Sequence, residues 1–400
     1  MPTQRPLVMR IITRLAGGGP PVHATLLNRQ MDQHGFDSVL VFGTCGAKEQ
    51  NMEYLIEKGD RVERVDVLGA RPSPVRDLLA VYRLWLLFRR YRPSIVHTHT
   101  AKAGFLGRIA ALLAGIPCVI HTYHGHVLDG YFAPWANRLI RCAERWLGRV
   151  STALCTVSQQ QAAELSGRFE IAPEEKFHVV PLGLTLEPYL AIPSPDFHSE
   201  RLTLAWLGRF VPIKNLGLLS GVAAACQERK LPIDFLIAGD GPERKDFEEQ
   251  IRSLALKNVQ LLPWQEDVGP VLERAHLLIL TSHREGTPLS LIQGMAAGRP
   301  FLSTAAGGTV DLAVGVGRLE TKSWWYENAV LVSPEIAAFL PVIERLLCNR
   351  RQLEAMSAAS RSFAQSVFSE TRLVADVAAL YTELLTPGQS GPHPVLEAKS

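Results

Sequence analysis

The sequence lacks the patterns that mark a disulfide framework, a zinc site or a membrane span. Its six cysteines include no C-x-x-C pair, so their spacing predicts neither structural zinc nor paired disulfides and fits a reducing compartment. No run of about 18 apolar residues occurs, so no membrane-spanning helix is predicted. Arg10 and Arg14 interrupt the N-terminal apolar segment, which predicts a first strand rather than a signal peptide. A cytoplasmic protein is expected.

The length and composition predict a packed protein with two cores. Apolar residues make up 47% and charged residues 20% of the 400 residues, and no long low-complexity stretch is present. Single hydrophobic cores stop growing at roughly 250 to 300 residues, so a chain of this length is expected to form two domains.

Short apolar runs alternate with helical patterns, which is typical of a parallel sheet covered by helices on both faces. The strands predicted in the first half are residues 8–13, 38–42, 95–98, 118–122 and 153–157. The same alternation of strands and helices begins again after a proline-rich segment, with strands predicted at 202–207, 234–238, 259–262, 277–280 and 300–303. The pattern predicts an α/β fold of two Rossmann-like, doubly wound domains that face each other across a cleft.

The proline-rich segment sets the expected domain boundaries. We expect an N-terminal domain at 1–185, a linker and hinge at 186–200, and a C-terminal domain at 201–369. Helical patterns follow at 334–348, 351–367 and 370–385, and the tail 387–400 is predicted to be disordered.

Residues 76–92 form a basic amphipathic pattern, in which five arginines surround leucines and aromatic residues. One interpretation is an ordinary surface helix whose apolar stripe joins the core. The other is peripheral docking on the inner face of a membrane.

Three loops with glycine or charged residues follow predicted strands. Open parallel sheets bind ligands at the carboxyl ends of their strands, which is where these loops begin. Gly18 and Gly19 belong to a glycine triplet that lacks the G-x-G-x-x-G spacing; it is either a tight turn or a loop that lets backbone amides approach a ligand. Arg209 and Lys214 follow the next domain's first strand, where two cations could clamp a diphosphate. Glu285 precedes a predicted helix at 289–297, as a capping acid or a ligand for sugar hydroxyls.

Histidines collect after two neighbouring strands of the first domain. They are His97, His99, His121, His124 and His126. Their loose spacing and the lack of a carboxylate partner favour satisfied or singly functional histidines over a metal site.

With these segments in place, the chain resembles the family 4 retaining glycosyltransferases of the GT-B fold over nearly its whole length. The motifs that carry the resemblance are the glycine-rich loop with His23, HTHTAKAG, TYHGH, VSQQQ, VVPLG, GRFVPIKN, AGDGPE and EGTPLSLIQGMAAGRP. The resemblance implies a UDP- or GDP-linked sugar as the donor and a glycan or a polyprenyl-linked molecule as the acceptor. It also implies that helix 370–386 crosses back to the acceptor-side N-terminal domain.

The resemblance assigns roles to individual residues. Arg209 and Lys214, with Gly18 and Gly19, would hold the donor diphosphate. Glu285 would act at the donor sugar beside the loop Gly286, Thr287 and Pro288, although Pro288 has no N–H. Trp264 would lie near the nucleobase.

One position departs from the family pattern. The second glutamate, which contacts the ribose, is replaced by Gln293, whose uncharged hydrogen bonds are weaker but can still bind hydroxyls.

The resemblance also assigns roles to the histidines. His124 would face the donor sugar as the catalytic histidine, and His99 and His126 would line the acceptor. No D-x-D element occurs, so no metal and no cofactor are expected. Two alternatives remain: a GT-B nucleotide-sugar epimerase, and a non-catalytic nucleotide-sugar-binding partner subunit. No nucleic-acid contact is expected.

Overall fold

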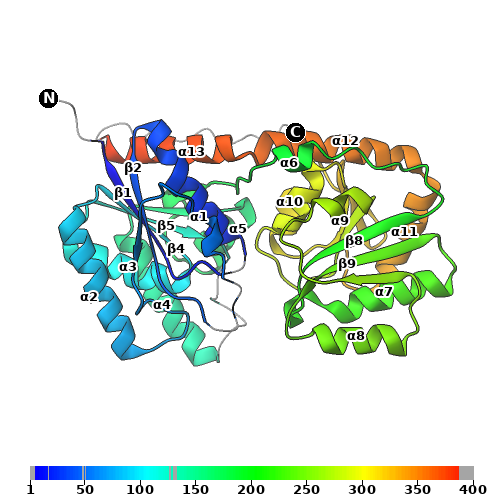
Figure 1. Ribbon diagram of the computed structural model, residues 1–400, viewed down its shortest axis with the longest axis horizontal. Helices are drawn as coiled ribbons and strands as arrows, with labels where there is room; N and C mark the ends of the chain where they lie inside the picture. The colour runs from blue at the N-terminus through cyan, green and yellow to red at the C-terminus, as the bar shows by residue number, and fades with distance from the viewer. Residues whose placement is uncertain are drawn as a thin grey trace. The chain divides into compact units, whose positions relative to one another are not determined.

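The computed structural model describes residues 5–16, 18–46, 49, 51–125, 128 and 133–386. Its contacts divide the chain into two compact units (Figure 1). The first runs to Leu184 and takes up the chain again at Glu370, and the second runs from Thr185 to Ser369. Residues 186–200, predicted as a linker, thus lie in the second unit and contain a short helix, α6 (Glu187–Leu190).

The first unit contains a seven-stranded sheet in the order β3-β2-β1-β4-β5-β6-β7, with every pair parallel. Its strands are β1 (Leu7–Ile12), β2 (Asp37–Phe42), β3 (Val62–Arg64), β4 (Ile95–His99), β5 (Cys118–Tyr123), β6 (Ala153–Thr156) and β7 (Phe177–Val179). This is the strand order of a complete doubly wound dinucleotide-binding sheet with an added edge strand.

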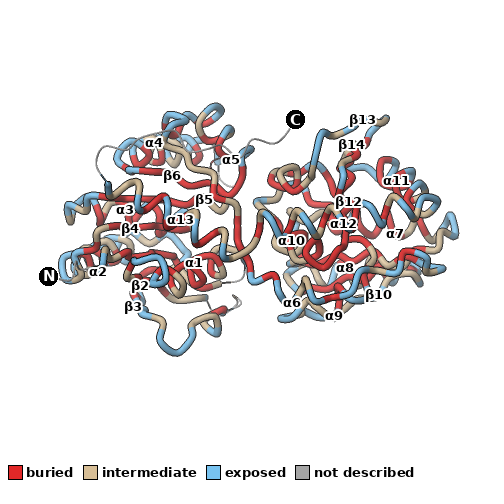
Figure 2. The backbone as a smooth tube through the Cα atoms, turned by 90° about the horizontal axis from the view of Figure 1, so that it is seen from above, coloured by how far each residue is buried: buried red, intermediate tan, exposed pale blue. Residues whose placement is uncertain are grey.

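Helices cover both faces of this sheet, because successive side chains of a strand point to opposite faces. They are α1 (Gly19–Gln30), α2 (Pro74–Tyr91), α3 (Ala101–Ala114), α4 (Pro134–Val150), α5 (Gln159–Ala163) and α13 (Glu370–Leu385). Val8 of β1 packs in one core with α1 and α13, and its neighbour Met9 packs in another core with α2 and α3. Figure 2 shows the buried residues following the strands.

The second unit repeats the arrangement in an eight-stranded sheet, in the order β10-β9-β8-β11-β12-β15-β14-β13. Its strands are β8 (Leu202–Arg209), β9 (Ile233–Asp240), β10 (Val259–Leu262), β11 (Leu277–Leu280), β12 (Phe301–Thr304), β13 (Arg318–Glu320), β14 (Ser323–Trp325) and β15 (Ala329–Val332). Its longer helices are α7 (Leu216–Glu228), α8 (Arg244–Ser253), α9 (Gly269–Arg274), α10 (Leu289–Ala296), α11 (Ile336–Cys348) and α12 (Arg350–Val367). The prediction of two Rossmann-like domains is confirmed.

The second sheet has an antiparallel edge. β14 pairs antiparallel with β15, and β13 pairs antiparallel with β14. Each of these two strands spans three residues, which is too short for its alternation to stand out in the sequence. The sequence pattern therefore predicted neither β13 nor β14.

Helix α2, which contains the basic amphipathic pattern, packs one face on the core and leaves the other exposed. Ala80, Leu84 and Phe88, spaced by four residues, are buried against the sheet. The opposite stripe stays exposed, with Leu78 at 73% and Tyr82 at 53%. No helix among the described residues is long and apolar enough to cross a membrane.

Candidate functional site

The predicted diphosphate-binding cations lie at the carboxyl end of β8. Arg209 is the last residue of β8 and is exposed, and no side-chain hydrogen bond ties it to another described residue. Lys214 ends a short 3-10 turn, η5 (Pro212–Lys214), and is followed by Asn215 in the left-handed conformation at φ 49°. The turn therefore separates an outward arginine from a lysine that points back to the sheet edge.

Lys214 meets Glu285, which lies 71 residues further along the chain. Its Nζ is 2.5 Å from Glu285 Oε1, and the two side chains are only 17% and 8% exposed. The hydroxyl of Ser282 donates to the same carboxylate oxygen at 2.5 Å. Two nearly buried opposite charges with a shared hydrogen bond form a fixed pair rather than a loose surface contact.

A glycine pair allows the loop after Glu285 to lie close to the next loop of the sheet. Gly308 donates its backbone N–H to Glu285 O at 3.3 Å. A Cβ on Gly308 would come within 1.9 Å of Gly286 O, and one on Gly307, at φ 56°, within 2.1 Å of Glu285 O. Sequence reasoning missed this pair, because the two glycines lie several residues beyond the strand predicted at 300–303 and their contact depends on how two loops pack.

The loop ends at the N-terminus of α10, whose N-cap is Pro288. The hydroxyl of Thr287 is buried and has no partner. The N–H groups in the first turn of a helix lack intrahelical acceptors and carry a partial positive charge. The N-terminus of α10 therefore brings such groups next to the unpartnered hydroxyl of Thr287. These are features that suit an anion.

The two remaining predicted residues of this unit lie on separate elements. Gln293, in α10, donates from Nε2 to the hydroxyl of Tyr189 in α6 at 2.8 Å. Trp264 follows β10 and is 37% exposed. The contact between Gln293 and Tyr189 could not be predicted from a local pattern, because the two residues are 104 positions apart.

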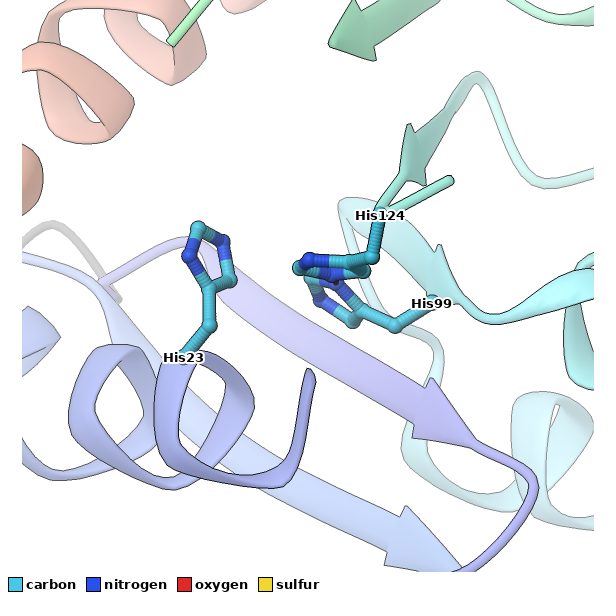
Figure 3. Close-up of side chains that lie close together, drawn as sticks. All are labelled: His23, His99 and His124. Carbon is cyan, nitrogen blue, oxygen red and sulfur yellow. Dashed lines mark hydrogen bonds between the residues drawn. The ribbon is translucent and has the colours of Figure 1, made fainter. Parts of the chain in front are cut away.

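The predicted histidine edge exists in the first unit. His99 ends β4 and His124 follows β5, and the parallel register of these strands places them side by side. His99 Nδ1 is 3.1 Å from His124 Nε2. His23, from α1, adds a third ring, with its centroid 4.8 Å from that of His124 (Figure 3). His126 lies outside the described residues.

The five described histidines at this edge fall into two groups. His97 bonds Tyr381 through Nδ1 at 2.5 Å and Thr122 through Nε2 at 2.7 Å. His121 bonds Thr98 at 2.9 Å. His23, His99 and His124 each keep one buried ring nitrogen without a partner.

Burial lowers the pKa of all five imidazoles, because a charged ring would lose its hydration. It lowers the pKa of His124 to about 3. The rings are therefore neutral at physiological pH.

The glycine triplet begins α1. Gly18 is its N-cap at φ 132°, a conformation that side chains rarely adopt, and Gly19 is its first residue, followed by Pro20. Gly17 lies outside the described residues. The structure thus joins Lys214 to Glu285 and His99 to His124, and leaves Arg209 and Trp264 without partners from the predicted set.

Two family models match the chain. A glycosyl transferase 4-like domain matches residues 18–183, and glycosyl transferases group 1 matches residues 201–349. Together they cover well over half of the sequence.

Known proteins resemble the chain in sequence and in fold. It is 30% identical over 254 residues to a UDP-Gal:alpha-D-GlcNAc-diphosphoundecaprenol alpha-1,3-galactosyltransferase of Escherichia coli, and the match covers 60% of this chain and 64% of that protein. The structure of Anabaena Alr3699/HepE in complex with UDP and glucose matches with a TM-score of 0.74 at 18% identity, covering 94% of this chain and 99% of that one. A sucrose-phosphate synthase from Thermosynechococcus elongatus matches with a TM-score of 0.77 at 19% identity, covering 95% and 99%.

Proposed function

The chain belongs to family 4 of the glycosyltransferases and has the GT-B fold, and from this we propose that it transfers a hexosyl-type sugar from a nucleotide-sugar donor to a hydroxyl of a glycan or lipid-linked acceptor, with retention. The observation that carries the proposal is the buried Lys214–Glu285 pair, at 2.5 Å, beside the N-terminus of α10. An ammonium and a helix N-terminus at one sheet edge suit a leaving diphosphate.

Lys214 and Arg209 neutralise the diphosphate in this proposal. An ammonium has three N–H donors, and the contact with Glu285 uses one of them, so the others remain for phosphate oxygens. Arg209, exposed at the end of β8, adds a planar fork that binds phosphate in a bidentate way. Gly18 and Gly19 offer backbone N–H groups from the first unit.

Glu285, the acidic member of the pair with Lys214, binds the donor sugar in this proposal. Its second carboxylate oxygen remains available to sugar hydroxyls, while Ser282 and Lys214 hold the first. The backbone of Gly286 and the unpartnered hydroxyl of Thr287 supply further donors next to Pro288. The Gly307–Gly308 contact keeps this loop in place.

Gln293 and Trp264 bind the nucleoside in this account. Gln293 donates to Tyr189, and its carbonyl oxygen is left to accept from ribose hydroxyls. Trp264 offers a partly exposed ring for the nucleobase.

We assign transfer chemistry to positioning and electrostatics rather than to a protein nucleophile or a metal. The bond from the sugar to the diphosphate breaks, the acceptor oxygen bonds to the same face, and the acceptor proton passes to the leaving diphosphate. We assign the neutral His124 to the transfer step and His99 to the acceptor. No cofactor takes part.

The donor class and the pathway follow from the relatives. The Escherichia coli relative is named for UDP-Gal and a diphosphoundecaprenol acceptor, and the Anabaena structure contains UDP and glucose. We therefore propose a UDP-sugar, with a GDP-sugar as the next candidate, and a role in envelope polysaccharide or glycolipid biosynthesis.

We also propose that α2 docks on an anionic membrane surface where such an acceptor is anchored. Its exposed stripe carries Val75, Leu78 and Tyr82 at 80%, 73% and 53% exposure. Arg83 and Arg90 are exposed on the same helix. Apolar side chains flanked by arginines are the composition that binds headgroups and the upper acyl region.

The test is a transfer assay with EDTA present, using UDP-glucose, UDP-galactose, UDP-N-acetylglucosamine and GDP-mannose with sugar-diphosphoundecaprenol acceptors. A product with the donor's anomeric configuration is expected. An inverted product would contradict retention, an epimerised donor would indicate an epimerase, and binding without turnover would indicate a partner subunit.

A further inference from the structure

Three histidines of the first unit converge on one point from three different elements. His23 comes from α1, His99 from the end of β4 and His124 from the residue after β5 (Figure 3). Each offers one ring nitrogen, and these three atoms lie within 4.8 Å of one another. His23 is 3% exposed and His99 is fully buried, so this is an internal cluster that opens to solvent at His124.

Hydrogen bonding within the protein leaves this cluster incomplete. Nδ1 of His23, Nε2 of His99 and Nδ1 of His124 are buried without a partner. A neutral imidazole has one N–H and one lone pair, so the single bond between His99 and His124 cannot satisfy both rings in any tautomer. Each unsatisfied buried polar atom costs about 1–3 kcal/mol.

The neighbouring His97 shows that the same edge can satisfy a histidine fully. Both of its nitrogens are bonded, to Tyr381 and Thr122. Its ring stacks on His99 with centroids 4.4 Å apart. His99 differs from His97, because its Nε2, the nitrogen that does not face His124, has no partner.

The chemistry of the cluster matches a transition-metal ion rather than Mg²⁺ or Ca²⁺. Burial lowers the pKa of all three rings, so they stay uncharged at neutral pH, and a metal ion between His99 Nδ1 and His124 Nε2 would replace the hydrogen bond that joins these two atoms. Imidazole nitrogens select Zn²⁺ and similar ions, whereas Mg²⁺ and Ca²⁺ require oxygen ligands.

The spacing also fits. The 3.1 Å between His99 Nδ1 and His124 Nε2 is close to the separation of two ligands in a tetrahedral zinc site, which is about 3.3 Å for Zn–N bonds of about 2.0–2.1 Å. A nitrogen as far as 4.8 Å from another must approach by about 1.5 Å to reach this separation.

We propose that His23, His99 and His124 form a three-histidine site for Zn²⁺, with water as the fourth ligand, and that the bound ion inhibits sugar transfer. The inhibition rests on the proposed function, in which His124 is assigned to the transfer step. An ion that takes the lone pair of His124 adds a dipositive charge where a neutral ring is needed, so zinc regulates a reaction that itself needs no metal.

Binding is measured on the tag-free protein by calorimetric titration of Zn²⁺ in metal-free buffer, with Mg²⁺ as the counter-probe. One Zn²⁺ per chain is expected, with a dissociation constant in the micromolar range or below, and no binding of Mg²⁺. His23→Gln should weaken this binding by roughly tenfold or more. His34→Gln, which changes an exposed histidine of the same unit, is the matched control and should leave it unchanged.

Two further measurements protect the test from misfolded variants. His23→Cys keeps a ligand atom and should retain zinc binding. Co²⁺ bound to the wild type should give the intense visible absorption of a four-coordinate site, which His99→Gln loses while circular dichroism stays unchanged. Zinc binding that His23→Gln and His99→Gln do not weaken would overturn the site.

The inhibition is tested separately, as each variant's transfer rate with Zn²⁺ divided by its own rate in EDTA. Wild type should lose at least about tenfold and His23→Gln much less. Full activity at saturating zinc would overturn the inhibition but not the site. Failure of the proposed function would instead appear as no transfer in EDTA with any donor, while the zinc titration stays readable.

Discussion

The Lys214–Glu285 pair permits a test that separates a structural ion pair from one that binds the donor. At 2.5 Å, and with an effective dielectric constant of about 20, the two charges attract each other by roughly 6–7 kcal/mol before desolvation is counted. Lys214→Met removes the charge and keeps the stem, leaving an 8% exposed carboxylate supported only by Ser282. Because an unpaired buried charge remains, the second unit should lose about 3 kcal/mol of its free energy of unfolding.

The rate should also fall. If Lys214 holds the leaving diphosphate, transfer by Lys214→Met or Lys214→Ala drops at least tenfold, or about 1.4 kcal/mol in transition-state stabilisation. Glu285→Ala should drop as much. Urea unfolding and initial rates with the identified donor measure the two effects.

The double variant Lys214→Met/Glu285→Gln decides between the two roles. Removing both charges leaves no buried ion, so most of the lost stability should return. The rate should not return, because the diphosphate has lost its cation. Lys322→Met is the matched control: Lys322 pairs with Glu335 at 2.6 Å but both are more than half exposed, so neither stability nor rate should change appreciably. Recovery of the rate together with stability would show that the pair is only structural, and wild-type rates in both single variants would overturn the site.

Three further outcomes are expected. Gln293→Glu should tighten nucleotide binding or leave it unchanged, measured by calorimetry, because a carboxylate accepts ribose hydroxyls more strongly than an amide. Arg89→Glu/Arg90→Glu should weaken binding to anionic liposomes, measured by sedimentation, by roughly thirtyfold or more, since each of the two arginines near such a surface contributes about 1 kcal/mol. Stability to urea should fall as pH drops from 7.5 to 5, because the pKa of five buried histidines is lower in the folded protein than the value of about 6.5 in the unfolded chain. The unfolded chain therefore takes up more protons. Each of these histidines should lower the free energy of unfolding by up to about 1.4 kcal/mol for each pH unit below 6.5.

Each of these outcomes has a contrary result. Marked weakening by Gln293→Glu would show that the glutamine is specifically adapted, through its contact with Tyr189. Arg318→Glu/Arg351→Glu changes the charge equally on exposed sites of the second unit, and equal loss of liposome binding there would remove the role of α2. Constant stability between pH 7.5 and 5 would mean that the histidines are not held neutral.

Local patterns sufficed for the parallel strands and the long helices. The buried strand β11 is a continuous apolar run, and the predicted bounds of β10 and β11 are confirmed. The helix predicted at 370–385 is α13, because its apolar residues recur with helical spacing.

Contacts between segments far apart in the sequence could not be predicted from local patterns. His23 was known only as part of a glycine-rich motif, and its approach to His99 depends on how α1 packs on the sheet. The Gln293–Tyr189 bond joins α10 to a helix in a segment expected to be a linker. The close approach of Gly308 to Gly286 likewise arises from the packing of two loops, which no local pattern encodes.

The central claim is that the second unit binds a nucleotide-sugar through Lys214 without a metal. Calorimetric titration with UDP, GDP and ADP and their sugar conjugates, with EDTA throughout, tests it most directly. Saturable binding of one nucleotide, lost in Lys214→Ala, is the predicted result. No binding of any of them, or binding that Lys214→Ala leaves unchanged, would contradict the account.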